Sequence, residues 1–111
     1  MREALIVLPN FDNNGQSIAT AHKRLATRLI DAFGGLTTRQ AQGAWVDHGK
    51  LYREDVTEYV VAYAPTAFND GTLREIATQA GHEARQLAVY ARFASGDVEI
   101  IDTAPAHAEA A

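Results

Sequence analysis

The chain has 111 residues and no cysteine, which predicts a single domain and excludes disulfides, thiolate catalysis and cysteine-based metal sites. It is 47% hydrophobic and carries a formal net charge of −4, so it can fill one core and does not favour a nucleic-acid backbone as partner. The apolar run at residues 4–8 is too short for a signal-peptide core or a membrane span. We therefore expect a cytoplasmic protein with neither a nucleic-acid nor a membrane partner.

The first predicted elements are a buried strand and a long helix. Residues 3–8 form a short apolar run that stops at Pro9, which is typical of a buried strand. Over residues 16–33, apolar residues recur at steps of three and four and predict an amphipathic helix. Its apolar stripe contains Ile18, Ala21, Leu25, Leu29 and Phe33. Gly34 and Gly35 end the helix, as glycine commonly does just past a helix.

Two strands are predicted after this helix. Residues 36–46 are a strand in which Gly43 indicates a bulge or the close approach of another backbone. The segment "DHGK" is a turn. Residues 51–64 alternate along a strand whose two faces are both largely apolar from Tyr59 onwards, which predicts an interior place in the sheet.

The second helix is expected over residues 72–86, after a loop with the sequence "PTAFNDG". Thr72 and Glu75 have the spacing of a capping box, with Thr72 as the N-cap. Gly81 lies inside this helix, where glycine costs roughly 1 kcal/mol relative to alanine. We therefore expect the helix to pack closely on the sheet at Gly81.

Residues 87–93 and 98–101 are expected to form a hairpin around a two-residue turn at Ser95–Gly96. The complete order of elements predicts an α+β, ferredoxin-like βαββαβ sandwich, in which two helices cover one face of an antiparallel sheet and a short C-terminal hairpin strand is added. We expect residues 1–103 to form this domain and residues 104–111 to be a flexible tail.

The second face of this sheet has no predicted element to cover it. Tyr90 and Arg92 alternate away from the Val89 and Phe93 side and belong on this face. One face of the strand that carries Tyr59 should join them. An uncovered face with tyrosines and an arginine is poorly suited to bare water. We expect a homodimer with Tyr90 and Arg92 at or near the contact, because a second copy is the commonest cover.

The loop "DNNG", residues 12–15, has two interpretations. Asn and Asp tolerate left-handed backbone, and Asn13 or Asn14 has the side chain to cap the following helix. Free N–H groups at a helix start also hold anions. Neither a GxxxxGK[ST] nor a GxGxxG phosphate motif is present, and the Asp12 carboxylate competes for the position of an anion. Composition favours a turn and cap, and any pocket should lie between this loop and the segment around Trp45.

Other chemistry-bearing residues give weaker indications. Trp45 is either a lid on the core edge or a stacking platform for a flat ligand. Arg53 and Glu54 are interpreted as a solvated pair at a sheet edge. The four histidines are scattered, and "GHEAR" lacks the second histidine of HExxH, so no metal site is expected. No catalytic residue is assigned, because neither a GxSxG elbow nor a distinctive carboxylate pair is present.

Several segments together resemble a family of small bacterial α+β proteins of unknown function. The matching positions are Phe33 to Thr37, Gly43 and Trp45, Gly49 to Glu54, and Gln86 to Val89. The resemblance covers roughly residues 30–93, while "LPNFDNNG" departs from the family pattern. It implies a ferredoxin-like fold and brings no established activity. Similar short chains also resemble proteins carried by phages and other mobile elements.

These observations favour a non-catalytic, homodimeric protein that binds a small anionic or nucleotide-like molecule, without a cofactor. A phage or mobile-element protein that sequesters a signal would be one such case. The predicted ligand-binding residues are Asp12, Asn13, Asn14, Trp45, Tyr90 and Arg92. One alternative is a cofactor-free dimeric α+β barrel enzyme of the monooxygenase or isomerase type. The other alternative is a structural or adaptor protein.

Overall fold

A computed structural model describes residues 1–105, so the part of the predicted tail at 106–111 lies outside the described residues. The described chain contains five strands and two helices. They are β1 (Arg2–Pro9), α1 (Ala19–Phe33), β2 (Thr37–Asp47), β3 (Lys50–Tyr63), α2 (Ala67–Glu83), β4 (Ala88–Arg92) and β5 (Val98–Asp102). The strand positions agree with the sequence-based prediction to within two residues at each end.

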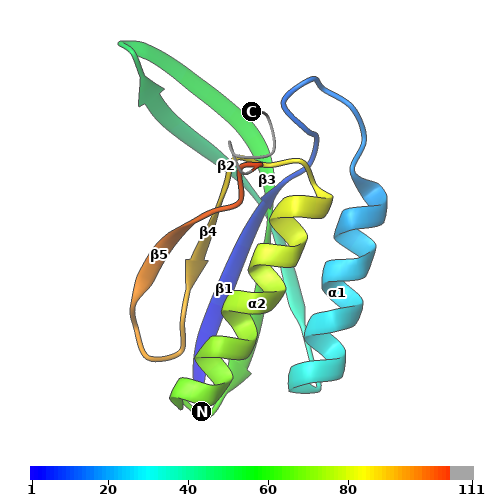
Figure 1. Cartoon of the computed structure of the whole chain (residues 1–111), viewed down its shortest axis with the longest axis vertical. Helices are drawn as coiled ribbons and strands as arrows, with labels where there is room; N and C mark the ends of the chain where they lie inside the picture. Colours follow the sequence, from blue (N-terminus) through cyan, green and yellow to red (C-terminus); the bar gives the residue numbers. More distant parts are fainter. Residues whose placement is uncertain (106–111) are drawn as a thin grey trace.

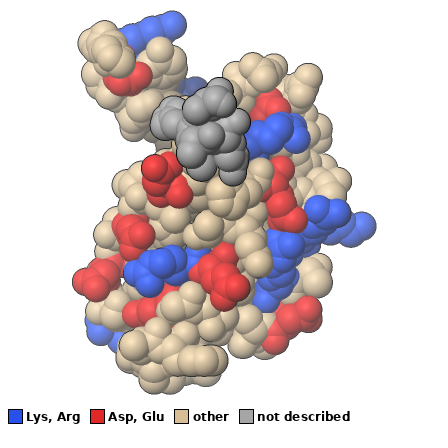
Figure 2. Space-filling model, viewed as in Figure 1, with Lys and Arg blue, Asp and Glu red and all other residues tan. Residues whose placement is uncertain are grey.

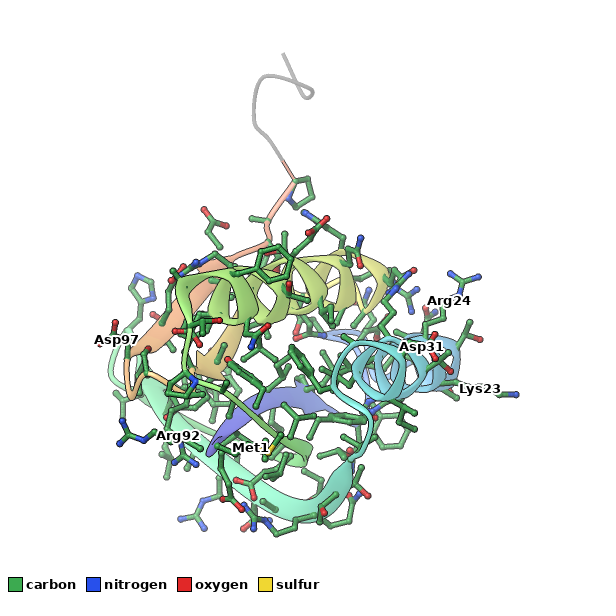
Figure 3. All side chains as sticks on the ribbon, turned by 90° about the horizontal axis from the view of Figure 1, so that it is seen from below. Met1, Lys23, Arg24, Asp31, Arg92 and Asp97 are labelled. Atoms are coloured by element: carbon green, nitrogen blue, oxygen red, sulfur yellow. The ribbon has the colours of Figure 1, made fainter. Side chains whose placement is uncertain are left out.

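The five strands form one antiparallel sheet in the order β2-β3-β1-β4-β5. Both helices lie on the same side of this sheet (Figure 1). The view along the strands shows the two layers, with Arg92 on the side of the sheet that faces away from the helices (Figure 3). The chain is therefore an α+β protein compatible with a ferredoxin-like fold, in which β5 adds a strand beside β4.

The core lies between the helices and one face of the sheet. Strand alternation directs every second residue into it, and the helices contribute their apolar stripes. The residues at 0% exposure in this cluster are Ala4, Ile6, Leu8, Leu25, Leu29, Leu73, Ala77, Ala80, Ala84 and Ala91. The stripe predicted for α1 is confirmed, because Ile18 and Ala21 are also buried and Phe33 packs against the cluster.

Helix α1 begins at Ala19, three residues later than the sequence predicted. The preceding residues fold into a turn around the carboxylate of Asp12, which accepts the N–H groups of Asn14 and Gln16. Ile18 is the N-cap, and the helix has no side-chain cap at that position. The prediction that Asn13 or Asn14 caps the helix is therefore wrong.

Helix α2 begins at Ala67, five residues earlier than predicted. The side chain of Thr66 accepts the N–H of Asn69 and is the N-cap. Thr72 lies inside the helix, where its hydroxyl donates to the carbonyl of Phe68. The capping box predicted at Thr72 is wrong, because Thr66 caps the helix six residues earlier in the chain.

The predicted close packing at Gly81 is confirmed. A Cβ built on this residue would lie 2.6 Å from Cγ2 of Thr103 and 2.7 Å from Cγ2 of Val89. Both neighbours are β-branched and almost completely buried. Only glycine lets α2 approach β4 and the end of β5 this closely. At Gly43 no such approach occurs, since the nearest non-adjacent atom to a built Cβ is 3.7 Å away and the strand register is unbroken.

The two hairpins differ in their turns. His48 and Gly49 connect β2 to β3, both with positive φ, as a two-residue type I′ hairpin turn requires. The β4–β5 turn has three residues, 94–96, because Phe93 accepts from Gly96 and donates to Asp97. The predicted two-residue turn at Ser95–Gly96 is therefore wrong, and Gly96 takes the left-handed position of a three-residue loop.

Strands β2 and β3 are longer than the strands beside them. Pairing of β1 with β3 stops at Pro9 opposite Val56, while the β2–β3 pairing continues to Asp47 opposite Lys50. Residues 42–55 therefore extend past the rest of the sheet, and we call them the hairpin arm (Figure 1). Within the described residues, no helix is both long and apolar enough to cross a membrane.

Candidate functional site

A pocket lies on the face of the sheet opposite the helices, where the hairpin arm meets β1 and β4. Its volume is about 460 Å³, within the range of roughly 300–1,000 Å³ typical of small-molecule sites. Residues of all five strands and of two loops contribute to its walls. The lining residues are Val7, Pro9, Asn13, Trp45, Glu54, Val56, Gln86, Leu87, Ala88, Tyr90 and Ile100. The walls are mainly apolar, with a few polar groups at defined places.

Trp45 is the largest flat surface of the pocket. Its ring stacks on Tyr52, with ring centroids 5.6 Å apart and an interplanar angle of 14°. Lys50 Nζ lies over the Tyr52 ring, 5.1 Å from its centroid, which is the geometry of a cation–π contact. Trp45 remains 45% exposed, so one part of the indole is held by its neighbour while another part is open to a ligand. This arrangement supplies a stacking surface fixed by a cross-strand pair.

Three polar side chains line the pocket. They are Asn13 from the β1–α1 loop, Glu54 from β3 and Gln86 from the α2–β4 loop. Partial burial raises the pKa of the Glu54 carboxyl above its ordinary value of 4.5. No lysine, arginine or histidine of the described chain lines this pocket. The pocket therefore presents amide groups and one carboxyl, and no positive charge for an anion.

The placement of Glu54 corrects its sequence-based interpretation. Arg53 and Glu54 were expected to form a solvated pair, but strand alternation directs them to opposite faces and no ion pair joins them among the described residues. Glu54 pairs in register with Gly43, two positions before Trp45 along β2. Glu54 could have been recognised as a pocket residue only from the strand face that it shares with Trp45. That face is known only once the register of β2 on β3 is known.

Asp12 supports the loop instead of lining the pocket. Its side chain is 3% exposed and its Oδ1 accepts the N–H groups of Asn14 (2.9 Å) and Gln16 (2.8 Å). Its Oδ2 accepts Nε and Nη2 of Arg85 at 3.0 and 2.8 Å. The N–H of Gln16 and the Arg85 guanidinium hold the pKa of Asp12 below its ordinary value. The carboxylate therefore occupies the place that an anion would take in this loop.

Tyr90 and Arg92 lie on the open face of β4, as their alternation predicts. Tyr90 lines the pocket, whereas Arg92 lies further along β4 and away from it. One face of β3, the strand that carries Tyr59, was expected to join these two residues. One face of β3 does line the pocket with Tyr90, and the residues that it contributes are Glu54 and Val56. Tyr59 and Tyr63 themselves face the helices and are 4% and 3% exposed.

His22, on helix α1, has a structural role in this fold. Its Nδ1 lies 2.6 Å from the hydroxyl of Tyr59 and its Nε2 lies 2.7 Å from the carbonyl oxygen of Pro9. Both ring nitrogens are thus engaged in joining α1 to Pro9 at the end of β1 and to Tyr59 within β3. No group of three or more potential metal ligands occurs in the part of the chain that the structure describes.

The structure thus brings three of the six predicted ligand-binding residues, Asn13, Trp45 and Tyr90, to one pocket. Asp12, Asn14 and Arg92 do not line it. The pocket lies between the β1–α1 loop and Trp45, at the position the sequence indicated. Sequence reasoning missed Glu54 and Gln86, and it missed the apolar wall formed by Val7, Val56 and Ile100. Ligand binding by these residues stays a prediction.

The fold and pocket define an α+β protein with a small-molecule-sized site on its open sheet face. No protein-family model matches the chain, and no curated protein matches it. Two solved structures are similar in fold. A phage SAM lyase in complex with S-methyl-5′-thioadenosine has a TM-score of 0.69 and 13% identity, over 90% of this chain and 88% of that chain. A phage SAM lyase in the apo state has a TM-score of 0.63 and 15% identity, over 90% and 87%.

Proposed function

We propose that this chain is a phage-type protein that binds an adenosine thioether or sulfonium compound in the sheet-face pocket, such as S-methyl-5′-thioadenosine or S-adenosylmethionine (SAM). The observation that carries the proposal is the pocket itself, which Trp45 lines together with Asn13, Glu54 and Gln86. The flat purine stacks on the indole, and the amides provide hydrogen bonds at its edge. The fold shared with a phage protein that binds S-methyl-5′-thioadenosine supports this ligand class.

The charge of the pocket limits the classes of ligand that it can bind. A phosphate group would face the carboxylate of Glu54 with no cationic side chain among the described lining residues. The helix side, by contrast, carries the mixed charges of α1 and α2 (Figure 2), and it lies on the opposite face of the sheet. A nucleoside without phosphate therefore fits better than the anionic or nucleotide-like ligand expected from the sequence. A positive sulfonium centre near Glu54 is the favoured variant.

The test is direct titration of the purified protein with S-methyl-5′-thioadenosine and with SAM by isothermal calorimetry, with adenosine monophosphate as the anionic comparison. The proposal expects saturable binding of the two sulfur compounds and much weaker binding of the monophosphate. Tight binding of the monophosphate alone would overturn the assignment of ligand class. Absence of binding by all three would overturn the proposed function.

A second candidate function, cleavage of SAM, is favoured by the carboxylate of Glu54 in the pocket. A carboxylate in this position accepts hydrogen bonds from the ammonium group of the amino-acid arm and thereby orients that arm for reaction. The substrate's own carboxylate oxygen attacks the carbon bonded to sulfur, the sulfur–carbon bond breaks with its electron pair going to sulfur, and the products are S-methyl-5′-thioadenosine and the lactone of the amino-acid arm. Chromatography of a reaction containing SAM distinguishes the two candidates, because a sequestering protein releases no S-methyl-5′-thioadenosine above the spontaneous rate and a lyase does.

Glu54→Gln is expected to weaken SAM binding by about tenfold at neutral pH and to change S-methyl-5′-thioadenosine binding little, because only SAM carries a positive sulfur. For wild type, SAM affinity should fall as the pH drops through the raised pKa of Glu54, since the protonated carboxyl no longer attracts the cation. In the glutamine variant this pH dependence should disappear. Calorimetric titrations across the acidic range check both expectations. An equal loss for both ligands would contradict an electrostatic role of Glu54.

The open sheet face also supports the proposal that the protein is a homodimer. Several large apolar side chains on or near this face and the arm remain exposed, namely Trp45, Val46, Leu51, Leu87, Val98 and Ile100. Figure 2 shows that the end of the arm projects from the molecule, with basic and acidic side chains beside uncharged ones. A second copy over this face would cover the apolar residues and reduce the access of water to the pocket.

Tyr90→Glu is expected to convert a dimer to a monomer, because it places an unpaired charge in the contact and burying such a charge costs several kcal/mol. Phe68→Glu is the matched control, since Phe68 is 82% exposed on α2 in the opposite layer. Light scattering at micromolar concentration measures both variants against wild type. A wild-type chain that runs as a monomer there would remove the dimer from the proposal.

A further inference from the structure

We infer that the ion pair between Asp12 and Arg85 is a latch that holds the two pocket-lining loops together and thereby positions Asn13 and Gln86 towards one ligand. The inference rests on the proposed function for the identity of that ligand. Asn13 belongs to the β1–α1 loop and Gln86 to the α2–β4 loop, and each directly follows one member of the pair in sequence. Asp12 and Arg85 are positioning residues, because neither lines the pocket.

The backbone at Arg85 shows that this residue is held in an uncommon conformation. Its φ is +55°, in the left-handed region that non-glycine residues rarely adopt. The N–H of Arg85 donates to the carbonyl of His82 and that of Gln86 donates to the carbonyl of Gly81, which is the hydrogen-bond pattern of a Schellman helix end. Glycine is the usual residue at this position. The side chain of Arg85 adds the contact to Asp12 that glycine would not provide.

The guanidinium meets a carboxylate that is already fixed. Asp12 Oδ1 accepts two backbone N–H groups of its own loop, and its backbone N–H donates to the carbonyl of Gln16. Oδ2 is then left to accept both Nε and Nη2 of Arg85, so two charge-assisted hydrogen bonds end on this one oxygen. The β1–α1 loop is thus held by hydrogen bonds of its own. Arg85 joins it to the α2–β4 loop.

The α2–β4 loop is anchored by contacts of its own. The Thr103 hydroxyl donates to the carbonyl of Gln86 at 2.7 Å, and the N–H of Thr103 donates to the carbonyl of Leu87 at 3.0 Å. The side chain of Gln86 is 7% exposed and donates to the carbonyl of Ala84. Each loop therefore has anchoring hydrogen bonds of its own, so loss of the ion pair should loosen both loops and change their separation without unfolding either one.

The experiment uses Arg85→Gln, Asp12→Asn and the double variant. Asparagine keeps an oxygen for the N–H groups of Asn14 and Gln16 and removes the charge that Arg85 meets. Arg74→Gln is the matched control, because Arg74 makes a comparable pair with Glu99 on the helix side, at 2.9 and 3.2 Å. Affinity for S-methyl-5′-thioadenosine is measured by calorimetry, and backbone hydrogen exchange is followed in peptides that cover residues 10–18 and 84–90.

Each single variant is expected to weaken S-methyl-5′-thioadenosine binding about tenfold, and the double variant should be no weaker than either, because both remove one shared contact. Exchange should accelerate in both loops in Arg85→Gln, and Arg74→Gln should change neither measurement. Unchanged affinity in the variants of a wild type that binds would overturn the latch. If wild type does not bind, the proposed function fails, and acceleration confined to residues 84–90 in Arg85→Gln would overturn the latch separately.

Discussion

Replacing Gly81 with alanine is expected to lower the free energy of unfolding by about 1–3 kcal/mol, the usual cost of overpacking a well-filled core. The added methyl would lie 2.6–2.7 Å from side-chain atoms of Thr103 and Val89, which real Cβ atoms do not tolerate. Both neighbours are β-branched, so rotation about χ1 offers them little relief. Helix α2 or the end of β5 must therefore shift. Urea denaturation followed by circular dichroism measures the loss.

Gly71 is the matched control for this prediction. It lies in the same helix, and a Cβ built on it meets no atom within 4 Å. Gly71→Ala should raise the free energy of unfolding by about 0.5–1 kcal/mol, because alanine has less backbone freedom to lose in a helix. The two substitutions therefore have opposite expected signs. A gain in stability for both would show that the sheet does not approach α2 closely at Gly81.

Replacing Trp45 with alanine is expected to weaken the binding of S-methyl-5′-thioadenosine by about 10- to 100-fold, because stacking of a base on an aromatic ring contributes roughly 1–3 kcal/mol. The effect on folding should be smaller, since the cross-strand pair with Tyr52 accounts for about 0.2–1 kcal/mol. Calorimetric titration measures the affinity, and urea denaturation measures the stability of the same sample.

Two further variants test whether the missing aromatic ring causes the loss of affinity in Trp45→Ala. Trp45→Phe keeps a flat ring and should recover most of the affinity. Phe68→Ala removes an aromatic ring from the far layer, where it is 82% exposed, and should leave binding unchanged. If Trp45→Ala binds as tightly as wild type, the indole is not the stacking surface and the ligand does not occupy the proposed pocket in the proposed orientation.

The alternation and periodicity of the sequence predicted most of the secondary structure because those patterns are local. The stripe from Ile18 to Phe33 and the alternation around Val89 are properties of the chain read in order, and tertiary packing agreed with them. The errors lie at element ends. Thr66 and Thr72 are both chemically suitable N-caps, and the hydrogen bond from Asn69 that selects Thr66 depends on the folded backbone.

The candidate site was predictable only in part. The sequence indicated that any pocket should lie between the loop at residues 12–15 and the segment around Trp45, because the indole offers an aromatic surface on which a flat ligand can stack, and the pocket lies there. It did not identify Glu54, since Trp45 and Glu54 share a face only through the register of β2 on β3. Gln86 was missed for a different reason: the end of α2 depends on a left-handed Arg85, where the sequence offers no glycine.

By itself, the sequence determined the α+β class and the antiparallel order of elements, because both follow from local periodicity, and it indicated close packing at Gly81. Only the tertiary structure decided which polar groups meet. Asp12 and Arg85 are 73 positions apart, and their contact depends on the chain bringing the ends of β1 and α2 together. Side chains distant in sequence are related by packing geometry, which no local pattern encodes.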